Sequence, residues 1–305
     1  MNILPKLVLA NNQRDDFISF HQSLQQDEYL YDYTGYQSLL FEFSSKAVIF
    51  YTVNNSKKIH DYSGVYLNGY LSTPELAMTA ATVLDANRVP YVNRELGSAP
   101  SLTKLSAYAK LASAGVSIPH TFGGAAYALL AGIRQGIIDL SLPVILKRAD
   151  ADRGIDNYKL DSYDDITALL EKQPERSIWV LQDFIPNDGF YLVSVYHGKP
   201  EFTIFRAMGE RRDGRKDKSH MFKPKGGENA KLITTEDSPK EVIDVSVAAA
   251  KAMNRQIASI DSLYDPQTKK AYVLEVNYNP QLVTITTFKE VRQQAFLNAV
   301  KQIEN

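Results

Sequence analysis

The segment from residue 257 to residue 277 constrains the fold of this chain more than any other. Two runs rich in β-branched and aromatic residues, IASIDSLYD and KAYVLEVN, are joined by the four residues PQTK. Such runs around a short turn predict two antiparallel strands. In the register that is symmetric about Thr268, Asp261 lies opposite Glu275, and directly opposed residues stand about 5 Å apart.

Oxygen-bearing side chains share one face of this predicted strand pair. Side chains alternate along a strand, so Glu275 and Asn277 point the same way, and Asp261 joins them on that face. Two opposed carboxylates repel each other unless something lies between them, and Mg²⁺ prefers oxygen ligands of this kind. Two interpretations follow from these residues alone: a metal site, or a solvated sheet face on which such residues are ordinary.

Composition excludes several classes of protein. The 305 residues provide for two modest domains or for one domain with several subdomains. The 34 lysines and arginines balance 35 acidic residues, which disfavours nucleic-acid and membrane-surface partners. The chain has no cysteine, so it has no disulfide, zinc ribbon or thiol nucleophile. No apolar run approaches the about 20 residues of a membrane span, and we expect a soluble, cytoplasmic protein.

Periodicity and turn residues predict alternating strands and helices along the chain. Strands are predicted at residues 46–53, 63–71, 143–149, 158–160, 177–185 and on both sides of HGKP. Helices are predicted from Thr73 with Pro74 in the first turn, from Lys104 to Gly115, from Ser162, and from Ser238, where Ser238 and Glu241 predict a capping box. The charged, glycine-bearing residues 209–229 predict a loop, and we expect residues 209–225 to act as a lid.

Two lysines stand where phosphate could bind. Lys147 closes the apolar strand PVILK, directly before a loop that carries Arg148, Arg153 and Gly154. Lys104 opens a helix, where the helix dipole does not favour a positive charge, so an anionic partner would stabilise it. Each lysine also has an ordinary interpretation, as a side chain at a sheet rim or on the surface. The stretch WVLQDFIP can likewise be a core strand, or a strand end that presents backbone groups to an adenine ring.

Taken in order, these segments resemble the ATP-grasp superfamily, and within it ligases such as the ribosomal-protein glutamate ligase. The similar segments lie between about residues 98 and 285: TKLSAYAKLASAGVSIPHT, LPVILKRADADRGIDNYKL, WVLQDFIPNDG, HGKPEFTIFR, Gly226–Gly227, and IASIDSLYD with AYVLEVNYNPQL. The resemblance implies an α/β, ATP-grasp fold of two α+β subdomains that grip ATP. It implies a small α/β pre-ATP-grasp domain at residues 1–97, a small lid subdomain at 98–185, and a large C-terminal subdomain with the metal site at 186–305.

The resemblance also implies a role for individual residues. It implies ATP and Mg²⁺ (or Mn²⁺) as cofactors. The residues that match the family's ATP-phosphate positions are Lys104 and Lys147, with the loop residues Arg153 and Gly154. Those that match the adenine positions are Gln182, Asp183, Phe184 and Ile185. Asp261, Glu275 and Asn277 match the metal positions, and Arg206 matches the position near the reacting phosphate. The activity implied is the ATP-dependent joining of a carboxylate and an amine through an acyl phosphate.

The chain departs from the family pattern on the substrate side. Phe190, Tyr191 and Leu192 stand where relatives commonly carry Asp-x-Arg. The phosphate loop has a single glycine, and SHMFKPK stands before Gly226 where an asparagine near a basic residue is usual. Another arginine could supply the positive charge that is missing here, and the sequence does not decide which one. The candidates are Arg148, Arg153, Arg211, Arg212 and Arg215.

Three functions are therefore weighed. The leading expectation is a carbon–nitrogen ligase whose partners are a small-molecule, amino-acid or peptide carboxylate and an amine. A kinase of the same fold and a non-catalytic nucleotide-binding protein are the alternatives, and the oligomeric state is not readable. The chain has neither a G-x-G-x-x-G after its first strand nor a G-x-S-x-G elbow, which disfavours a Rossmann dehydrogenase and a serine hydrolase.

Overall fold

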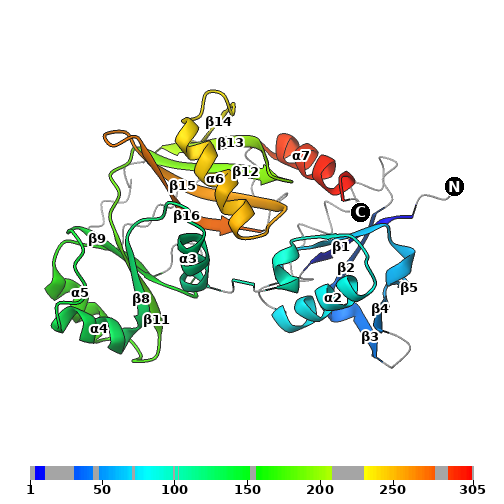
Figure 1. Cartoon of the computed structure of the whole chain (residues 1–305), viewed down its shortest axis with the longest axis horizontal. Helices are drawn as coiled ribbons and strands as arrows, with labels where there is room; N and C mark the ends of the chain where they lie inside the picture. Colours follow the sequence, from blue (N-terminus) through cyan, green and yellow to red (C-terminus); the bar gives the residue numbers. More distant parts are fainter. Residues whose placement is uncertain are drawn as a thin grey trace.

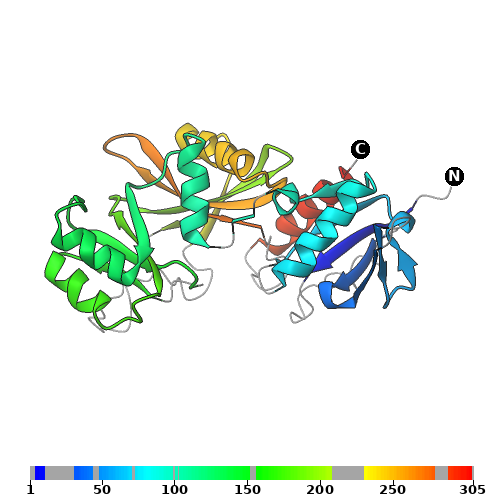
Figure 2. The same cartoon turned by 60° about the horizontal axis from the view of Figure 1, so that its bottom comes forward.

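The computed structural model describes residues 4–10, 31–43, 48–70, 73–98, 100–101, 103–151, 156–207, 230–278 and 288–303. The strands within these ranges form four sheets. Figure 1 shows three units in a row: a sheet with α4 and α5 at one end, a sheet with α6 in the middle, and an N-terminal unit with α2 at the other end. The view of Figure 2 preserves this order, with α3 standing between the first two units.

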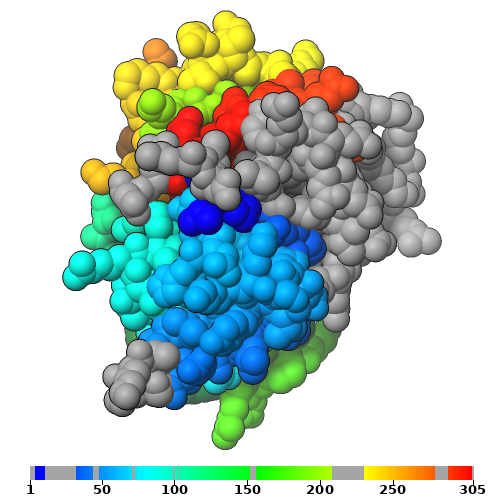
Figure 3. All heavy atoms as spheres, turned by 90° about the vertical axis from the view of Figure 1, so that its right-hand side faces the viewer, coloured from blue at the N-terminus to red at the C-terminus, as the bar shows by residue number. Residues whose placement is uncertain are grey.

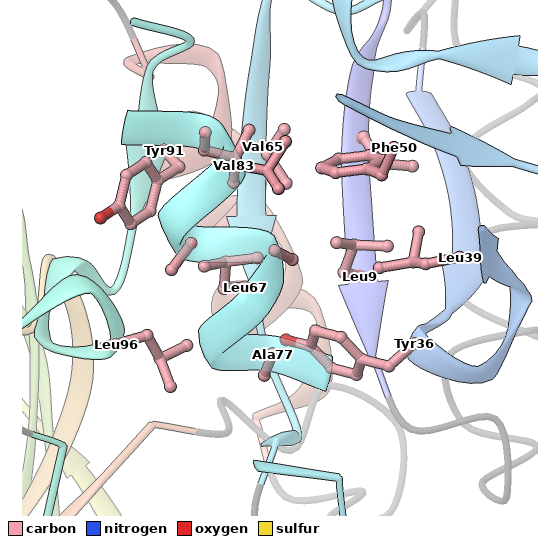
Figure 4. Close-up of a cluster of buried hydrophobic side chains, with 14 of the residues drawn as sticks. Leu9, Tyr36, Leu39, Phe50, Val65, Leu67, Ala77, Val83, Tyr91 and Leu96 are labelled. Carbon is pink, nitrogen blue, oxygen red and sulfur yellow. The ribbon is translucent and has the colours of Figure 1, made fainter. Parts of the chain in front are cut away.

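The N-terminal unit is built around a parallel sheet with the strand order β2-β1-β6-β7. Its strands are β1 (Lys6–Ala10), β2 (Tyr31–Gly35), β6 (Gly64–Leu67) and β7 (Tyr91–Val92), and α2 (Pro74–Ala86) covers one face. An antiparallel sheet of β3 (Leu39–Phe43), β4 (Val48–Thr52) and β5 (Lys57–Lys58) lies beside it. Short 3-10 turns occupy Tyr36–Ser38, Ile59–Asp61 and Arg94–Gly97. Figure 4 shows Leu9, Val65 and Leu67 pointing toward α2, with Phe50 of β4 closing the same core.

The second unit is an antiparallel sheet with two helices on one face. The strand order is β10 (Asn157–Leu160), β9 (Val144–Arg148), β11 (Ile178–Asp183) and β8 (Thr121–Ala125). The helices α4 (Ala126–Arg134) and α5 (Tyr163–Leu170) pack on Leu146, Trp179 and Leu181, which alternate toward that face. The opposite face carries Lys147 and Gln182, which belong to the candidate site described below.

The third unit is an antiparallel sheet of five strands. Its order is β14 (Ala230–Ile233), β13 (Lys199–Ala207), β12 (Gly189–Tyr196), β15 (Ile257–Asp265) and β16 (Lys270–Asn277). On one face, α6 (Lys240–Ala252) and α3 (Lys104–Ser113) share a core with Ile260 and Val273. On the other side, α7 (Lys289–Lys301) packs between this sheet and the N-terminal unit. Figure 3 shows the red residues of the C-terminal segment directly beside the blue N-terminal unit.

The predicted α/β, ATP-grasp-like order of elements agrees with this architecture at most positions. The predicted strands and helices that fall on described residues are present, and the turn of the last strand pair is PQTK as expected. The strands β1, β2, β3, β5, β8 and β14 and the helices α4 and α7 were not predicted, and the predicted capping box was wrong. The helix α6 begins at Lys240, because Pro239 is extended, and the Ser238 hydroxyl donates to the Thr234 carbonyl.

Other expectations stay open. The division of the chain at residues 97 and 185 stays a proposal, since sheet membership alone does not fix domain boundaries. The expected lid at residues 209–225 lies outside the described residues. Within the described ranges, no helix combines the length and the hydropathy that crossing a bilayer requires.

Gly189 provides a test of the third sheet. It opens β12 where β13 passes so close that an added β-carbon would overlap the carbonyl oxygen of Arg206 and lie 2.9 Å from the Cα of Ala207. Because both neighbours are backbone, Gly189→Ala should destabilise the protein by about 1–3 kcal/mol and lower its melting temperature. The control is Gly124→Ala in β8, where the nearest atom, the β-carbon of Ala128, is 3.8 Å away. Equal melting temperatures for the two variants would contradict the expectation.

Candidate active site

The pairing of β15 with β16 places Asp261 opposite Glu275 and Ser259 opposite Asn277. The predicted pair of carboxylates is confirmed, but a bulge produces it. Ser262 pairs with Val273, whereas the symmetric register would pair it with Leu274. The register therefore shifts by one residue between Asp261 and Ser262. Leu274 is the extra residue on β16, and a bulge of this kind places two residues opposite one. Without the bulge, Glu275 would lie on the face of α6.

The three oxygen-bearing side chains form one group. The Asn277 amide donates to Asp261 Oδ2 at 3.5 Å. Asp261 is half-buried as a residue, yet its Oδ1 has no contact with solvent and no hydrogen-bond partner among the described residues. Burial and, to a lesser degree, the charge of Glu275 raise the pKa of Asp261 to about 7, although Arg206 and the hydrogen bond from Asn277 act in the opposite direction. A buried carboxylate that faces a second one is unstable as an anion, and a cation between them removes the conflict.

The donor set fits a hard divalent cation. It consists of two carboxylates and an amide, all oxygen donors, which are the ligands that Mg²⁺ and Mn²⁺ prefer. The described residues contain no cluster of three or more histidine, aspartate or glutamate side chains that would offer a second site. The orphaned Oδ1 of Asp261 is the observation that supports a metal here, because a buried acceptor without a partner is rare.

Two lysines from outside this sheet approach the same carboxylates. Lys104, at the first position of α3, places its Nζ 3.9 Å from Glu275 Oε1 and donates to the carbonyl of Ala151. Lys147 of β9 is buried, with 9% of its surface exposed. Burial lowers the pKa of Lys147 to about 8; Glu275 raises it and Lys104 lowers it. The predicted convergence of both lysines on one place is therefore present, and two positive charges this close to each other favour an anionic ligand.

Gln182, the first residue of the predicted adenine-binding segment, lies on the same face of the second sheet as Lys147. In the pairing of β9 with β11, Val180 is opposite Lys147 and Gln182 is opposite Ile145. The Gln182 amide nitrogen donates to Thr121 Oγ1 at 2.7 Å, while its buried Oε1 has no partner within the described residues.

The backbone of this segment is partly engaged already. The N–H of Asp183 donates to the His120 carbonyl at 3.1 Å, and the N–H of Phe184 donates to Pro143 at 3.3 Å. The Ile185 carbonyl accepts from Asn187 Nδ2 at 2.8 Å. The N–H groups of 183 and 184 are therefore already bonded, whereas the Gln182 Oε1 and the ring of Phe184 are available to a planar ring.

Arg206 of β13 lies on the face of the sheet that carries Asp261. It is opposite Phe190, and its guanidinium carbon is 5.7 Å from the centre of that ring. Its Nε is buried and has no hydrogen-bond partner among the residues described. Leu192 is the direct neighbour of Asp261 on β12. The two residues that replace the usual charged pair therefore form an apolar floor between Arg206 and the carboxylates.

Some predicted residues do not join the group. Arg148 points to the other face from Lys147 and forms exposed ion pairs with Asp150 at 2.7 Å and Asp156 at 3.1 Å. Arg153 and Gly154 lie outside the described residues, as do Arg211, Arg212 and Arg215.

Two residues near the site were missed from the sequence. The Lys159 ammonium is 4.1 Å from the centre of the Phe184 ring. The Tyr108 hydroxyl donates to the carbonyl of Leu274, the bulge residue, at 2.7 Å. Strand alternation could have found Lys159, because Asn157 is opposite Lys147 in β9 and Lys159 follows on the same face. Tyr108 gave no such signal, since its spacing in α3 is that of a core residue.

Comparisons with known proteins agree with this geometry. The family model described as RimK-like ATP-grasp domain matches residues 101–297, a range that contains every candidate site residue. No curated protein sequence matches the chain.

Solved structures extend the likeness over the whole chain. The ligase PsnB complexed with the precursor peptide PsnA2 and AMPPNP is 15% identical, covers 99% of this chain and 100% of its own, and has a TM-score of 0.66. D-alanine–D-alanine ligase from Bacillus anthracis is 15% identical, covers 98% of this chain and 97% of its own, and has a TM-score of 0.61. The RimK domain protein ATP-grasp from Sphaerobacter thermophilus DSM 20745 is 13% identical, covers 99% of this chain and 100% of its own, and has a TM-score of 0.60. At these identities the likeness shows the fold, and the predicted ATP-grasp fold is confirmed.

The raised pKa of Asp261 gives a prediction for the metal-free protein. Between pH about 4 and 7 the folded state keeps a proton that the unfolded state has released, so stability falls as pH rises through this window. Asp261→Asn removes this loss and should be more stable than the unmodified chain at pH 8, by about 3 kcal/mol, with little difference near pH 4.

Urea unfolding in EDTA at a series of pH values measures the effect. The control is Asp150→Asn, because the hydrogen bond from Arg148 lowers the pKa of that exposed carboxylate. It should give no gain at pH 8. Parallel curves for Asp261→Asn and the unmodified chain would show that Asp261 ionises normally.

Proposed function

The chain belongs to the RimK-like ATP-grasp family, and from this premise we propose that it is an ATP-dependent carboxylate–amine ligase that forms an amide or peptide bond through an acyl phosphate. The observation that carries the proposal is the meeting of two sheets at one charged group. Lys147 and Lys104 reach Glu275 from one side, and Asp261 and Asn277 stand beside it on the other sheet. Lysines facing carboxylates are suited to a phosphate chain bound together with a cation.

The metal ligands in this proposal are Asp261, Glu275 and Asn277. The orphaned Oδ1 of Asp261 and the all-oxygen donor set support Mg²⁺, or Mn²⁺ in its place. When bound, the cation neutralises phosphate charge and makes the γ-phosphorus a better electrophile.

The remaining residues bind and orient ATP. Lys104 and Lys147 donate to phosphate oxygens, and an anion next to Lys147 restores the pKa that burial has lowered, so the amine stays protonated. Gln182 and the ring of Phe184, with Lys159 on that ring, receive the base. Arg206 donates to the oxygens of the phosphoryl group in transfer, where a fixed positive charge is most effective.

The proposed reaction has two displacement steps. A carboxylate oxygen of the first substrate forms a bond to the γ-phosphorus, the bond from that phosphorus to the β–γ bridging oxygen breaks, and ADP leaves. The nitrogen of the amine then attacks the acyl carbon of the acyl phosphate. The carbon–oxygen bond to the phosphate breaks, inorganic phosphate leaves, and the nitrogen loses one proton. Positioning and charge neutralisation by the chain are sufficient for both steps.

The apolar floor bears on the substrate class. Phe190 and Leu192 carry no charge, so among the described residues the cation that acts on Asp261 is Arg206, on the same face of the sheet. A carboxylate whose neighbouring atoms are apolar or aromatic suits this floor better than a highly charged one. We therefore propose an amino-acid or peptide carboxylate; among the similar structures, one is a D-alanine–D-alanine ligase and another is PsnB in complex with a precursor peptide.

A thermal-shift titration with Mg-ATP tests the site. Ligand at about 100 times its dissociation constant stabilises the folded state by about 2.7 kcal/mol, which corresponds to a shift of about 5 °C. The shift should disappear in Asp261→Asn/Glu275→Gln and without magnesium. The matched control is Arg134→Gln/Glu171→Gln, which removes an exposed pair on the helices behind the second sheet and should keep the full shift. An unchanged shift in the first double variant would refute the metal site.

Product analysis tests the reaction. With a panel of amino-acid and peptide carboxylates and hydroxylamine as the amine, ATP turnover should yield ADP and an acyl hydroxamate. Arg206→Gln should bind Mg-ATP but lose about a hundredfold or more in turnover. A product that carries phosphate on a hydroxyl group would instead assign a kinase. Binding of Mg-ATP without ADP release on any carboxylate would favour the non-catalytic alternative.

A further inference from the structure

A buried ion pair that the proposed reaction does not use joins the N-terminal unit to the third sheet. Arg255 lies two residues before the start of β15, and Glu95 lies in the 3-10 turn that follows β7. Arg255 Nε donates to Glu95 Oε1 at 2.6 Å, and their side chains are 3% and 0% exposed. The hydroxyl of Tyr70 donates to the same carboxylate, and Arg255 Nη2 contacts that hydroxyl at 3.3 Å.

The other arm of the guanidinium reaches the metal-binding strand. Arg255 Nη1 donates to the carbonyl of Val276, which stands between Glu275 and Asn277. The guanidinium carbon is also 5.5 Å from the centre of the Tyr278 ring. Arg255 therefore bonds to the N-terminal unit and to the backbone between two candidate metal ligands at the same time.

Contacts from the N-terminal unit continue past the end of β16. The rings of Tyr70 and Tyr278 stack with their centres 4.4 Å apart. The hydroxyl of Tyr66 donates to the Tyr278 carbonyl at 3.1 Å. Asn277 is thus held on its two sides, through the carbonyls of Val276 and Tyr278, by groups that the N-terminal unit contacts or supplies.

The strand needs this support because it is the edge of its sheet. Edge strands have backbone groups without a neighbouring strand to bond them. The carbonyls of Leu274 and Val276, which bracket Glu275, are bonded instead to the side chains of Tyr108 and Arg255. A fixed peptide plane fixes the direction of the side chains on either side of it, and groups behind metal ligands tune metal affinity in this way.

Stability alone is a weak reason for the pair. Buried ion pairs contribute little net stability relative to apolar residues of similar size, because removing two charges from water offsets their attraction. A guanidinium has a rigid fork of donors, which suits it to hold two acceptors in a fixed relative position. The carboxylate of Glu95 and the carbonyl of Val276 are such a pair of acceptors.

We propose that Arg255 is a positioning residue that, anchored by Glu95, fixes the end of β16 and thereby couples the N-terminal unit to the metal-binding residues. The metal part of this inference rests on the proposed function. The positioning part rests on the contacts themselves. Loosening the pair should therefore change the order of residues 274–278 and weaken metal binding, whereas loosening the same boundary elsewhere should do neither.

A double variant and a matched control separate these effects. Arg255→Met/Glu95→Gln removes both charges together, so that no buried charge is left alone. The control is Gln256→Met. The Gln256 side chain accepts from the N–H groups of Asn93 at 2.8 Å and Arg94 at 3.0 Å, so it joins the same two segments. Its side-chain bonds in the described part of the chain reach no residue of β16.

Two measurements are made on each protein. Hydrogen exchange of the segment 270–278 without metal reports the order of the strand end. Electron paramagnetic resonance of Mn²⁺, titrated with a non-hydrolysable ATP analogue, reports metal affinity. In the double variant we expect exchange at 274–278 to accelerate and the Mn²⁺ dissociation constant to rise, each by about tenfold or more. In Gln256→Met both should stay within about twofold of the unmodified chain.

Either of two results would overturn the inference. The first is a folded double variant with unchanged exchange and unchanged Mn²⁺ affinity, and the second is an equal change in Gln256→Met. If the double variant does not fold, Tyr70→Phe, which keeps both charges, should give a smaller change in the same direction. If the unmodified chain binds no Mn²⁺ with nucleotide, the proposed function and the metal part fail together, and the exchange data alone decide the positioning role.

Discussion

The bulge at Leu274 is the feature on which the candidate site depends. Regular pairing from Ser262 to Asp265 would carry Glu275 to the face that packs against α6, where a carboxylate would meet the apolar core. One extra residue turns Glu275 and Asn277 to the side of Asp261 and leaves Val276 facing the core. The bulge is stabilised from outside, because Tyr108 donates to the Leu274 carbonyl. The helix that begins with the phosphate-binding candidate Lys104 thus also contacts the bulge of the strand that carries the candidate metal ligands.

Two charged groups of the site, Asp261 and Lys147, have pKa values shifted toward their neutral forms. Burial and Glu275 raise the pKa of Asp261, and burial and Lys104 lower the pKa of Lys147. Each shift marks a charged form that the empty site disfavours. A bound cation and a bound phosphate reverse both shifts, because each supplies the opposite charge at the right place. If nucleotide and metal bind as proposed, both would relieve this electrostatic penalty, and the binding of each would favour the binding of the other.

Much of this was predictable from the sequence, and the reasons for the remainder are physical. The strand pair, its PQTK turn and the shared face of Glu275 and Asn277 follow from two-residue alternation and local turn residues. The Asp261–Glu275 pair was predicted from a symmetric register, although the real cause is a bulge that no local signal marks. The Arg255–Glu95 pair spans 160 positions of sequence and becomes visible only when two units pack together. The helix α4 was missed because its glycine-bearing surroundings resemble a loop.

The apolar floor explains why a departure from the family pattern and a working site are compatible. Phe190 and Leu192 lower the local dielectric beside Asp261 and Arg206, which strengthens the interaction of a fixed guanidinium with phosphate. In the proposed reaction they would also keep water away from the acyl phosphate. The same burial raises the pKa of Asp261 to about 7, so that a cation beside it would favour the charged form. In the proposed site, loss of the usual charged pair would increase the dependence on metal and on Arg206, and the proposed coupling through Arg255 would link that dependence to the N-terminal unit.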